Sequence, residues 1–249
     1  MTHIYQQILD AKKQNKKLLA VLIDPDKMDI ALVPQFIENV NTSVATHIFV
    51  GGSEVAPHAT NVLVKTIKQH TKLPVVLFPG DITQIAPSAD ALLFLSLISG
   101  RNAAYLIGKH VKAVPLLNNT NLEILPTGYI LVAPDNHTLN KISAVQRVTG
   151  TTPICGSNIQ EIANTAKAGQ LLGMKLIYLE AGSGALQPIS QALITTVKAC
   201  ITVPLIVGGG IKSVQQLQAA YQSGADLVVI GTAFETDETF FSELQKPNL

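Results

Sequence analysis

The sequence predicts an α/β fold, a (β/α)₈ TIM barrel that forms one domain over residues 1–249. Three observations support this prediction. Eight short runs rich in apolar and β-branched residues recur along the chain, they are continuous rather than alternating, and most are separated by segments with helical signals. Continuous runs are typical of parallel strands that are buried on both faces. Eight strands with interleaved helices in a chain of 249 residues match the usual size of this barrel. A doubly wound open sheet is the alternative.

The eight expected strands are LLAVLI (18–23), HIFVG (47–51), PVVLFP (74–79), ALLFLS (91–96), GYILVA (128–133), KLIYL (175–179), PLIVG (204–208) and LVVIG (227–231). Two of the connecting helices have capping signals at their start. Ser157 with Gln160, and Ser213 with Gln216, each fit a capping box, in which side chains satisfy N–H groups of the first helical turn. The second of these helices is expected to end at Gly224, because glycine readily adopts the left-handed backbone that closes a helix.

Two connections between the strands are irregular. Only GDITQIAPSAD (80–90) separates the third run from the fourth, and Pro87 would break a helix placed there. We therefore expect a third helix that is shortened or missing, which leaves an opening on that side of the barrel. A one-turn helix without functional meaning is the alternative. The stretch VKAVPLLNNTNLEILPT (111–127) is expected to form a loop on the active face or an inserted hairpin.

The composition favours a soluble cytoplasmic protein that binds no nucleic acid. The chain has 18 basic and 17 acidic residues and no long basic run, whereas nucleic-acid binding needs a basic surface. The two cysteines, Cys155 and Cys200, are far apart and fit a reducing compartment. The polar start of the chain lacks the apolar core of a signal peptide, and the longest apolar run, ALLFLSLIS (91–99), is too short to span a bilayer.

Glycines after the last two expected strands predict a phosphate site. Active sites of such barrels lie at the carboxyl ends of the strands, and phosphate rests on the loops after strands seven and eight. Gly209 and Gly210 follow the seventh run, and Gly231 and Thr232 follow the eighth. Glycine lets the backbone approach an anion closely, and threonine adds a hydroxyl donor. Glycines that only turn the chain at the barrel rim are the alternative.

Oxygen-bearing side chains after the first two strands predict a Mg²⁺ site. Asp24 begins an Asp-Pro-Asp segment after the first strand, and Ser53 follows the second strand. Carboxylate oxygen suits Mg²⁺, which keeps several waters and bridges substrate phosphates. A plain turn or a helix cap is the alternative for Asp-Pro-Asp. The six histidines show no zinc-binding spacing, so a zinc site is not expected.

Five segments of the chain, in matching order over nearly its whole length, resemble those of a known family. They are LIDPDK (22–27), FVGGS (49–53), YLEAGSGA (178–185), VGGGIKS (207–213) and ADLVVIGTAFE (225–235). Together they resemble the geranylgeranylglyceryl phosphate synthase family, in the branch that includes bacterial members. The resemblance implies a Mg²⁺-dependent prenyltransferase on a barrel whose third helix is replaced. Such an enzyme joins sn-glycerol 1-phosphate to a long-chain prenyl diphosphate, with geranylgeranyl diphosphate as the expected donor, and forms an ether.

The resemblance also assigns residues to the two parts of the site. Asp24 and Ser53 correspond to the Mg²⁺ positions. Some family members have a lysine two positions before the metal aspartate, where this chain has Leu22, so the part of the nearby Lys27 in phosphate binding stays open. The glycerol phosphate site implied by the resemblance comprises Tyr178, Leu179, Glu180, Ala181, Gly182, Ser183, Gly184, Gly209, Gly210, Gly231 and Thr232.

Glu180 is the candidate catalytic base of this reaction. A glycerol hydroxyl becomes a good nucleophile when it loses its proton, and Glu180 directly follows the sixth run, before the Gly-Ser-Gly turn at 182–184. The alternative is a carboxylate that only orients the glycerol hydroxyls. The prenyl tail is expected in an apolar groove formed by the exit of the fourth strand, Tyr105, Leu106 and the opening at the third connection. Arg101 and Lys109 are candidates for the diphosphate, with exposed surface charges as the alternative.

Two other functions stay open at the level of sequence. An isomerase, aldolase or lyase that acts on a sugar phosphate would explain the glycines, but not the pairing of Asp24 with Ser53. A non-catalytic sensor of a phosphate ligand is the other alternative, and the presence of Asp24, Ser53 and Glu180 together argues against it. Association of identical chains and a transient membrane contact that releases product are further expectations.

Overall fold

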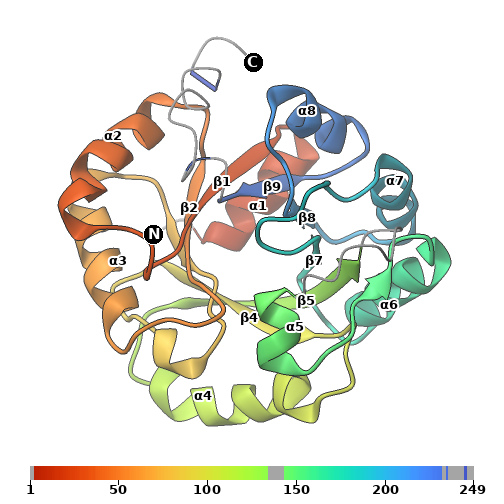
Figure 1. The fold of residues 1–249 in the computed structure, drawn as a ribbon, viewed down its shortest axis with the longest axis horizontal. Coiled ribbons are helices and arrows are strands. Elements are labelled where there is room, and N and C mark those ends of the chain that lie inside the picture. Colours follow the sequence, from red (N-terminus) through yellow and green to blue (C-terminus); the bar gives the residue numbers. More distant parts are fainter. Residues whose placement is uncertain (1–2, 134–142, 232–233, 235–243, 246–249) are drawn as a thin grey trace.

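Eight parallel strands form a closed barrel (Figure 1). The structure, a computed structural model, describes residues 3–133, 143–231, 234 and 244–245. The strands follow one another in the order β4-β3-β2-β1-β9-β8-β7-β5, and pairing of β4 with β5 closes the ring. Their bounds are β1 Leu18–Ile23, β2 His47–Val50, β3 Val75–Leu77, β4 Ala91–Leu97, β5 Glu123–Ala133, β7 Leu176–Glu180, β8 Leu205–Gly208 and β9 Leu227–Ile230. The predicted barrel and its eight strands are confirmed, and the open sheet is excluded.

Helices surround the barrel in the ring that Figure 1 shows. They are α2 Val33–Thr42, α3 Ala59–His70, α4 Lys109–Leu117, α6 Ile159–Leu171, α7 Gln191–Cys200 and α8 Val214–Gln222, and a π-helical turn at Ala104–Gly108 precedes α4. The short helix α5 Ala144–Thr149 lies inside this ring, and the short strand β6 Ile154–Cys155 pairs with the end of β5. Among the described residues, no helix combines the length and the apolar character needed to cross a membrane.

The alternation of side chains along each strand divides the core into two parts. Successive side chains of a strand point to opposite faces. On β7, Leu176 and Tyr178 belong to the cluster inside the barrel, whereas Ile177 and Leu179 belong to the cluster between barrel and helices, and all four are fully buried. Since both faces are covered, the strands need apolar residues at every position, which explains their continuous apolar runs.

Helix α1 (Ile4–Lys13) closes the amino-terminal end of the barrel. Its buried residues Ile4, Ile8 and Ala11 belong to the cluster inside the barrel. The carboxylate of Glu123, at the start of β5, accepts hydrogen bonds from the backbone N–H groups of Ile4 (2.5 Å) and Tyr5 (3.1 Å). Helix ends leave such N–H groups without partners inside the helix, so this carboxylate both caps α1 and attaches it to the barrel.

The third connection contains no α-helix. Between β3 and β4 the structure has a single 3₁₀ turn, η2 (Ile82–Gln84), in which the Asp81 side chain accepts a hydrogen bond from the Thr83 N–H. The prediction of a shortened or missing third helix is therefore confirmed.

The prediction for residues 111–127 is wrong. This stretch contains most of α4 and the first residues of β5, not a loop or a hairpin. Pro115 lies in the last turn of α4, where its missing N–H deprives only the carbonyl of Val111, a residue exposed to solvent. Pro126 lies in β5 one residue before pairing with β7 begins at Thr127, so it too is tolerated.

Neither of the two predicted capping boxes forms in full. At α8 the Ser213 hydroxyl accepts a hydrogen bond from the Gln216 N–H as expected, but the Gln216 side chain accepts from the Lys212 N–H (2.7 Å) instead of the Ser213 N–H. This helix ends two residues before Gly224. At α6 the cap residue is Asn158, because the Ser157 hydroxyl lies instead 3.0 Å from the Cys155 thiol.

Replacing Glu123 tests how α1 is attached. We expect Glu123→Ala to lower the free energy of unfolding by about 2 kcal/mol, since two N–H groups of α1 lose their acceptor. Urea denaturation measures this change. Glu123→Gln, which keeps one acceptor oxygen, is the matched control and should lose less. Equal stability of all three proteins would contradict the prediction.

Candidate active site

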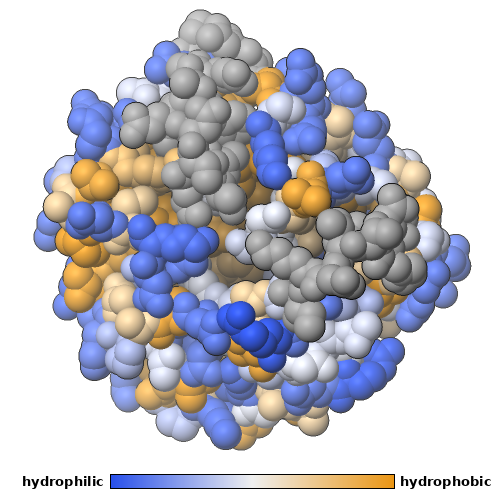
Figure 2. Space-filling model, in the orientation of Figure 1, coloured by the Kyte–Doolittle hydropathy of each residue, from blue (hydrophilic) through white to orange (hydrophobic). Residues whose placement is uncertain are grey.

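A cavity of about 1510 Å³ opens at the carboxyl ends of the strands. In the view of Figure 2, apolar residues lie in the hollow near the centre of the molecule, and hydrophilic residues lie to its left and below it. The cavity exceeds the range of about 300–1,000 Å³ that is typical of sites for one small ligand. It brings together most of the residues predicted from the sequence, namely Asp24, Ser53, Tyr178, Glu180, Ala181, Gly182, Ser183, Gly184, Gly209, Gly210 and Gly231.

Two of the predicted site residues are not placed in this cavity. Leu179 is fully buried in the cluster outside the barrel, because the alternation of β7 turns its side chain away from the inward-facing Tyr178. The end of β7 and the loop after it therefore line the cavity, but the Leu179 side chain does not. Thr232 lies outside the residues that the structure describes.

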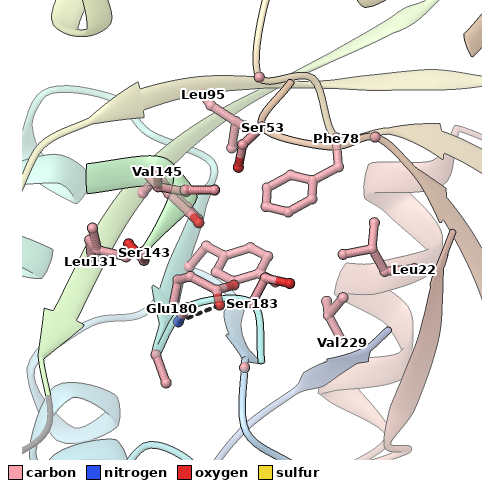
Figure 3. Close-up of a pocket in the computed structure, with 18 of the residues that line it drawn as sticks. Leu22, Ser53, Phe78, Leu95, Leu131, Ser143, Val145, Glu180, Ser183 and Val229 are labelled. Carbon is pink, nitrogen blue, oxygen red and sulfur yellow. Dashed lines mark hydrogen bonds between the residues drawn. The ribbon is translucent and has the colours of Figure 1, made fainter. Parts of the chain in front are cut away.

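Glu180 is a buried carboxylate at the top of the barrel. It is the last residue of β7, its exposed fraction is 6%, and Figure 3 shows its side chain beside the cavity with a hydrogen bond to the backbone. That bond is donated by the Gly182 N–H over 2.7 Å to Oε1. Burial raises the pKa of the Glu180 carboxyl to about 7, although the Gly182 N–H and the neighbouring Tyr178 hydroxyl act in the opposite direction. A carboxyl with such a pKa can take up and release a proton near neutral pH.

Aromatic rings form the floor beneath Glu180. The ring of Tyr178 stacks on Phe78, with centroids 5.3 Å apart, and meets Tyr129 edge to face at 5.2 Å. The Tyr178 hydroxyl is buried and has no hydrogen-bond partner of regular geometry among the described residues. Gly208 makes room for it, because a Cβ at that position would lie 2.2 Å from the hydroxyl oxygen.

The loops after β7 and β8 pack closely against each other through glycines. Gly209 has a φ of +85°, and a Cβ there would lie 2.6 Å from Oε1 of Glu180. Gly210 has a φ of +75°, and a Cβ there would lie 2.4 Å from the carbonyl oxygen of Gln187. Both positions therefore require glycine for space as well as for conformation. This confirms close backbone packing at the rim where the phosphate site is predicted.

Asp24 and Ser53 line the opposite side of the same cavity. The Asp24 carboxylate accepts a hydrogen bond from the Asp26 N–H (3.2 Å), and its Oδ2 lies 3.4 Å from the Lys27 ammonium. A Cβ on Gly52 would lie 2.8 Å from Oδ1, so the turn before Ser53 touches this carboxylate. One carboxylate and one hydroxyl fit Mg²⁺, which takes its other oxygen ligands from waters and phosphates. Within the described residues, no cluster of three or more His, Cys, Asp or Glu could hold a metal without such ligands.

An apolar arm of the cavity extends to the third connection. Ile82 and Ile85 of that connection, Phe94 of β4 and Ala113 of α4 line it. Because no α-helix covers this side, the space between η2 and α4 belongs to the cavity. An apolar part of the cavity is thus present where the groove is expected. The exit of β4 contributes Phe94 to this arm, whereas Leu95 and Leu97 line the cavity from inside the barrel.

The residues predicted to contact the prenyl tail and the diphosphate lie in different places. Tyr105 and Lys109 line the cavity, whereas Leu106 does not. The Lys109 ammonium forms an ion pair with Asp81 and lies over the Tyr105 ring, so it is already engaged within the protein. The Arg101 guanidinium donates to the carbonyl of Gly100 (2.8 Å) away from the cavity lining.

Several residues that shape the site were not predicted from the sequence. Phe78, Tyr129, His110 and Gln84 were not singled out, although the first three line the cavity. The alternation of the strands is a signal that could have identified Phe78 and Tyr129, because each lies at an even spacing from an inward-facing residue of its strand. His110 and Gln84 had no comparable signal, because their elements were expected to be irregular.

The family of the chain is shown by its sequence. The PcrB family matches residues 11–246. The chain belongs to the PcrB family. A protein of Zunongwangia profunda named geranylgeranylglyceryl phosphate synthase is 55% identical over 238 residues, which cover 96% of this chain and 99% of that relative. The protein of the same name from Flavobacterium johnsoniae is 52% identical over 241 residues, which cover 97% of each chain.

A solved structure supports the same assignment. The crystal structure of (S)-3-O-geranylgeranylglyceryl phosphate synthase from Thermoplasma acidophilum, in complex with its substrate sn-glycerol-1-phosphate, superposes with a TM-score of 0.89 at 30% identity. The match covers 98% of this chain and 96% of that one. The resemblance read from five segments is therefore confirmed, and this PcrB-family chain is a prenyltransferase. The sugar-phosphate enzyme and the non-catalytic sensor are set aside.

Burial of Glu180 predicts a pH-dependent cost in stability. The folded pKa of about 7 lies above the ordinary value of 4.5, so the folded state holds this proton more tightly. The resulting stabilisation is complete below pH 4.5 and is lost as pH rises through 7, which leaves a relative cost on the order of 3 kcal/mol at pH 8. Glu180→Gln removes that cost, because its amide cannot ionise and its oxygen can still accept the Gly182 N–H.

We therefore expect Glu180→Gln to be more stable than the wild type at pH 8, with a much smaller gain at pH 4.5. Chemical denaturation at both values measures the difference. Glu38→Gln, on the exposed side of α2, is the control and should show no such dependence on pH. An equal gain at both values would show that Glu180 ionises as readily in the folded chain as in the unfolded one.

Proposed function

We propose that this PcrB-family protein transfers a long-chain prenyl group, with geranylgeranyl as the favoured one, from its diphosphate to sn-glycerol 1-phosphate. The observation that carries the proposal is a single cavity with two chemically different ends. One end has the glycine-rich loops around Glu180, and the other is the apolar arm that leaves through the third connection. A small anionic acceptor and a long apolar donor can thus meet in one enclosed space.

The glycerol phosphate is placed at the loops after β7, β8 and β9. Gly182, Gly184, Gly209 and Gly210 have backbone angles that few other residues adopt, and such loops let N–H groups approach a phosphate closely. Support comes from the Thermoplasma acidophilum relative, whose structure is a complex with sn-glycerol-1-phosphate. Glu180 lies beneath these loops, where it can contact the glycerol hydroxyls.

Asp24 and Ser53 are the residues that would hold Mg²⁺. When bound, Mg²⁺ supplies positive charge that stabilises the departing diphosphate. Lys27, beside Asp24, adds a positive charge near the same place. The metal and the diphosphate are thereby placed on the β1 and β2 side, between the glycerol phosphate loops and the apolar arm.

Glu180 acts as the general base in this proposal. A glycerol hydroxyl oxygen forms the new bond to the allylic carbon of the donor, while the bond from that carbon to the diphosphate oxygen breaks. The hydroxyl proton passes to Glu180, and diphosphate leaves with the electron pair. The aromatic floor of Phe78, Tyr129 and Tyr178 keeps water from reaching the allylic carbon from below.

The outer face of α4 and its preceding turn supports two further parts of the proposal, association of identical chains and a transient membrane contact during product release. Ile107, Val111 and Val114 follow a helical spacing and are exposed by 60%, 65% and 48%. An apolar stripe of this kind suits either another protein surface or a lipid surface. It lies on the helix whose opposite face lines the apolar arm.

A direct assay tests the reaction. We expect ether product when the protein is incubated with sn-glycerol 1-phosphate, Mg²⁺ and prenyl diphosphates of several lengths, as detected by mass spectrometry. Omitting Mg²⁺ in the presence of a chelator should abolish the product, and sn-glycerol 3-phosphate should be a poorer acceptor. Absence of product at every chain length would defeat the proposal.

The role of Glu180 has its own test. We expect Glu180→Gln to lower kcat at least about 100-fold, as is typical when a general base is lost, with little change in the affinity for sn-glycerol 1-phosphate. In the wild type, kcat/KM should rise with pH through about 7 as the carboxyl ionises. Near-normal turnover of the variant would mean that Glu180 only orients the acceptor.

A further inference from the structure

The loop that replaces the third helix packs directly against the turn that carries Ser53. A Cβ added to Gly80 would lie 2.5 Å from the carbonyl oxygen of Gly52 and 2.9 Å from that of Ser53. These distances are too short for any side chain, so the two backbones are in contact. The third connection therefore does not only link β3 to β4, because its backbone also packs against the turn that contains Ser53.

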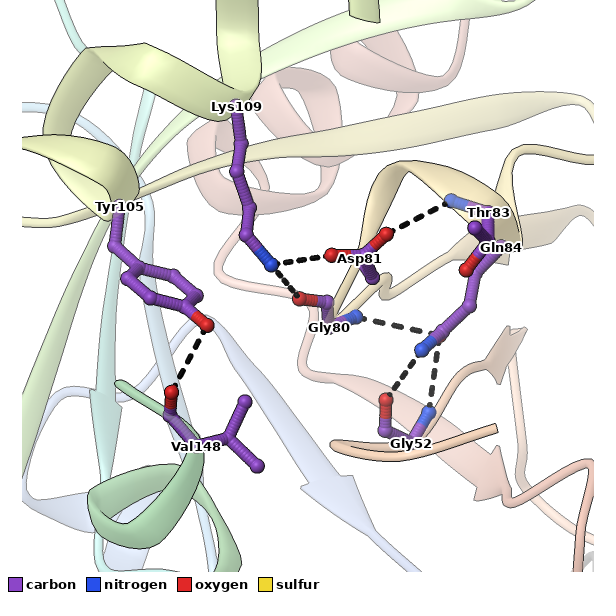
Figure 4. Close-up of polar contacts among 8 residues, drawn as sticks. All are labelled: Gly52, Gly80, Asp81, Thr83, Gln84, Tyr105, Lys109 and Val148. Carbon is purple, nitrogen blue, oxygen red and sulfur yellow. Dashed lines mark hydrogen bonds and ion pairs between the residues drawn. The ribbon is translucent and has the colours of Figure 1, made fainter. Parts of the chain in front are cut away.

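A buried carboxamide joins the two backbones (Figure 4). Gln84, exposed by only 2%, donates from Nε2 to the carbonyl of Gly52 over 2.8 Å. Its Oε1 accepts from the N–H of Gly80 (3.2 Å) and from the N–H of Gly52 (3.4 Å). The Gln84 side chain thus binds both the N–H and the carbonyl of Gly52 and links this residue to Gly80 of the third connection.

The chemistry of this contact requires a carboxamide. The site presents one carbonyl acceptor and two N–H donors, and only a group with both a donor and an acceptor can satisfy them together. Water has little access to compete, because Gln84 is almost completely buried. Backbone groups left unpaired in such a place carry a desolvation penalty, so their loss would move the turn.

The Gly52 turn lies between the two residues predicted to hold the cation. Gly52 touches the Asp24 carboxylate and immediately precedes Ser53 in the chain. The third connection is also attached to α4. Asp81 forms an ion pair with Lys109 of α4, and the Lys109 ammonium donates to the Gly80 carbonyl over 3.3 Å. A chain of contacts therefore runs from α4 through the loop and Gln84 to the turn before Ser53.

We propose that Gln84 is a positioning residue for divalent-cation binding, which holds the Gly52–Ser53 turn so that the Ser53 hydroxyl stands beside Asp24. The inference rests on the proposed function in its use of Asp24 and Ser53 as the cation ligands. It assigns to the missing third helix a role in the reaction: the segment that replaces it supplies the support for the ligands as well as the opening of the cavity.

Binding of Mn²⁺ in the presence of inorganic diphosphate tests this inference without turnover. Electron paramagnetic resonance measures free Mn²⁺ and thus its dissociation constant. Gln84→Met keeps the volume of the side chain but removes all three hydrogen bonds, and we expect it to weaken Mn²⁺ binding about 10-fold or more, as is typical for the loss of a residue that orients a ligand. Affinity for sn-glycerol 1-phosphate, bound at the other side of the cavity, should change less than about twofold.

Two further variants separate positioning from general stability. Gln170→Ala is the matched control, because the Gln170 carboxamide likewise accepts from loop N–H groups, those of Thr202 (2.6 Å) and Val203 (3.4 Å), away from the cavity lining. It should leave Mn²⁺ binding unchanged. Gln84→Glu keeps the acceptor but sets an oxygen against the Gly52 carbonyl, so it should weaken Mn²⁺ binding even where Gln84→Met folds poorly.

The outcomes distinguish this inference from the proposed reaction. Unchanged Mn²⁺ affinity in both Gln84 variants overturns the inference, as does an equal loss in the Gln170 control or an equal loss of glycerol phosphate binding. Failure of the wild type to bind Mn²⁺ with diphosphate also overturns it. If the wild type binds Mn²⁺, the Gln84 variants do not, and yet no ether product forms in the assay, then the positioning role stands and the proposed reaction fails.

Discussion

Pairing of β4 with β5 over seven residues is the constraint on which the site depends. It closes the sheet even though no α-helix covers β3 and β4 at the third connection. A closed parallel sheet brings all strand ends to one mouth, and it turns every second side chain inward. Glu180, the glycine loops and the turns with Asp24 and Ser53 meet in one cavity for this reason, although they are far apart in the chain.

The closed barrel also explains why the Glu180 carboxylate lowers the stability of the fold and yet has a pKa that suits proton transfer. The inward position that places Glu180 over the aromatic floor removes it from water and raises its pKa to about 7. The neighbouring glycines provide the space for this arrangement, because a Cβ at Gly208 or Gly209 would collide with Tyr178 or with Glu180 itself. The site thus holds an ionisable group where folding alone would favour an apolar one.

The sequence predicted the barrel, its eight strands and the missing third helix, because these depend on local signals such as apolar runs and prolines. The family resemblance and the glycines at strand ends assigned thirteen site residues, of which eleven line the cavity. The sequence did not predict α1 as the closure of the barrel, since its attachment depends on Glu123, more than a hundred residues away. It included Leu179 by contiguity, whereas the strand alternation turns that side chain outward. Gln84 gave no signal because its importance lies in two backbones that approach only in the folded chain.

The sealed underside of the barrel sets the route by which protons travel. Below Glu180 lie the rings of Tyr178, Phe78 and Tyr129, and below them the apolar interior closed by α1. In the part of the chain that the structure describes, this layer is apolar and buried, so a proton on Glu180 exchanges with solvent through the cavity above it and not through the barrel interior. In the proposed reaction, the substrates occupy this same cavity. In that reaction, the proton therefore leaves Glu180 through the same cavity that the products occupy, and its release follows their departure.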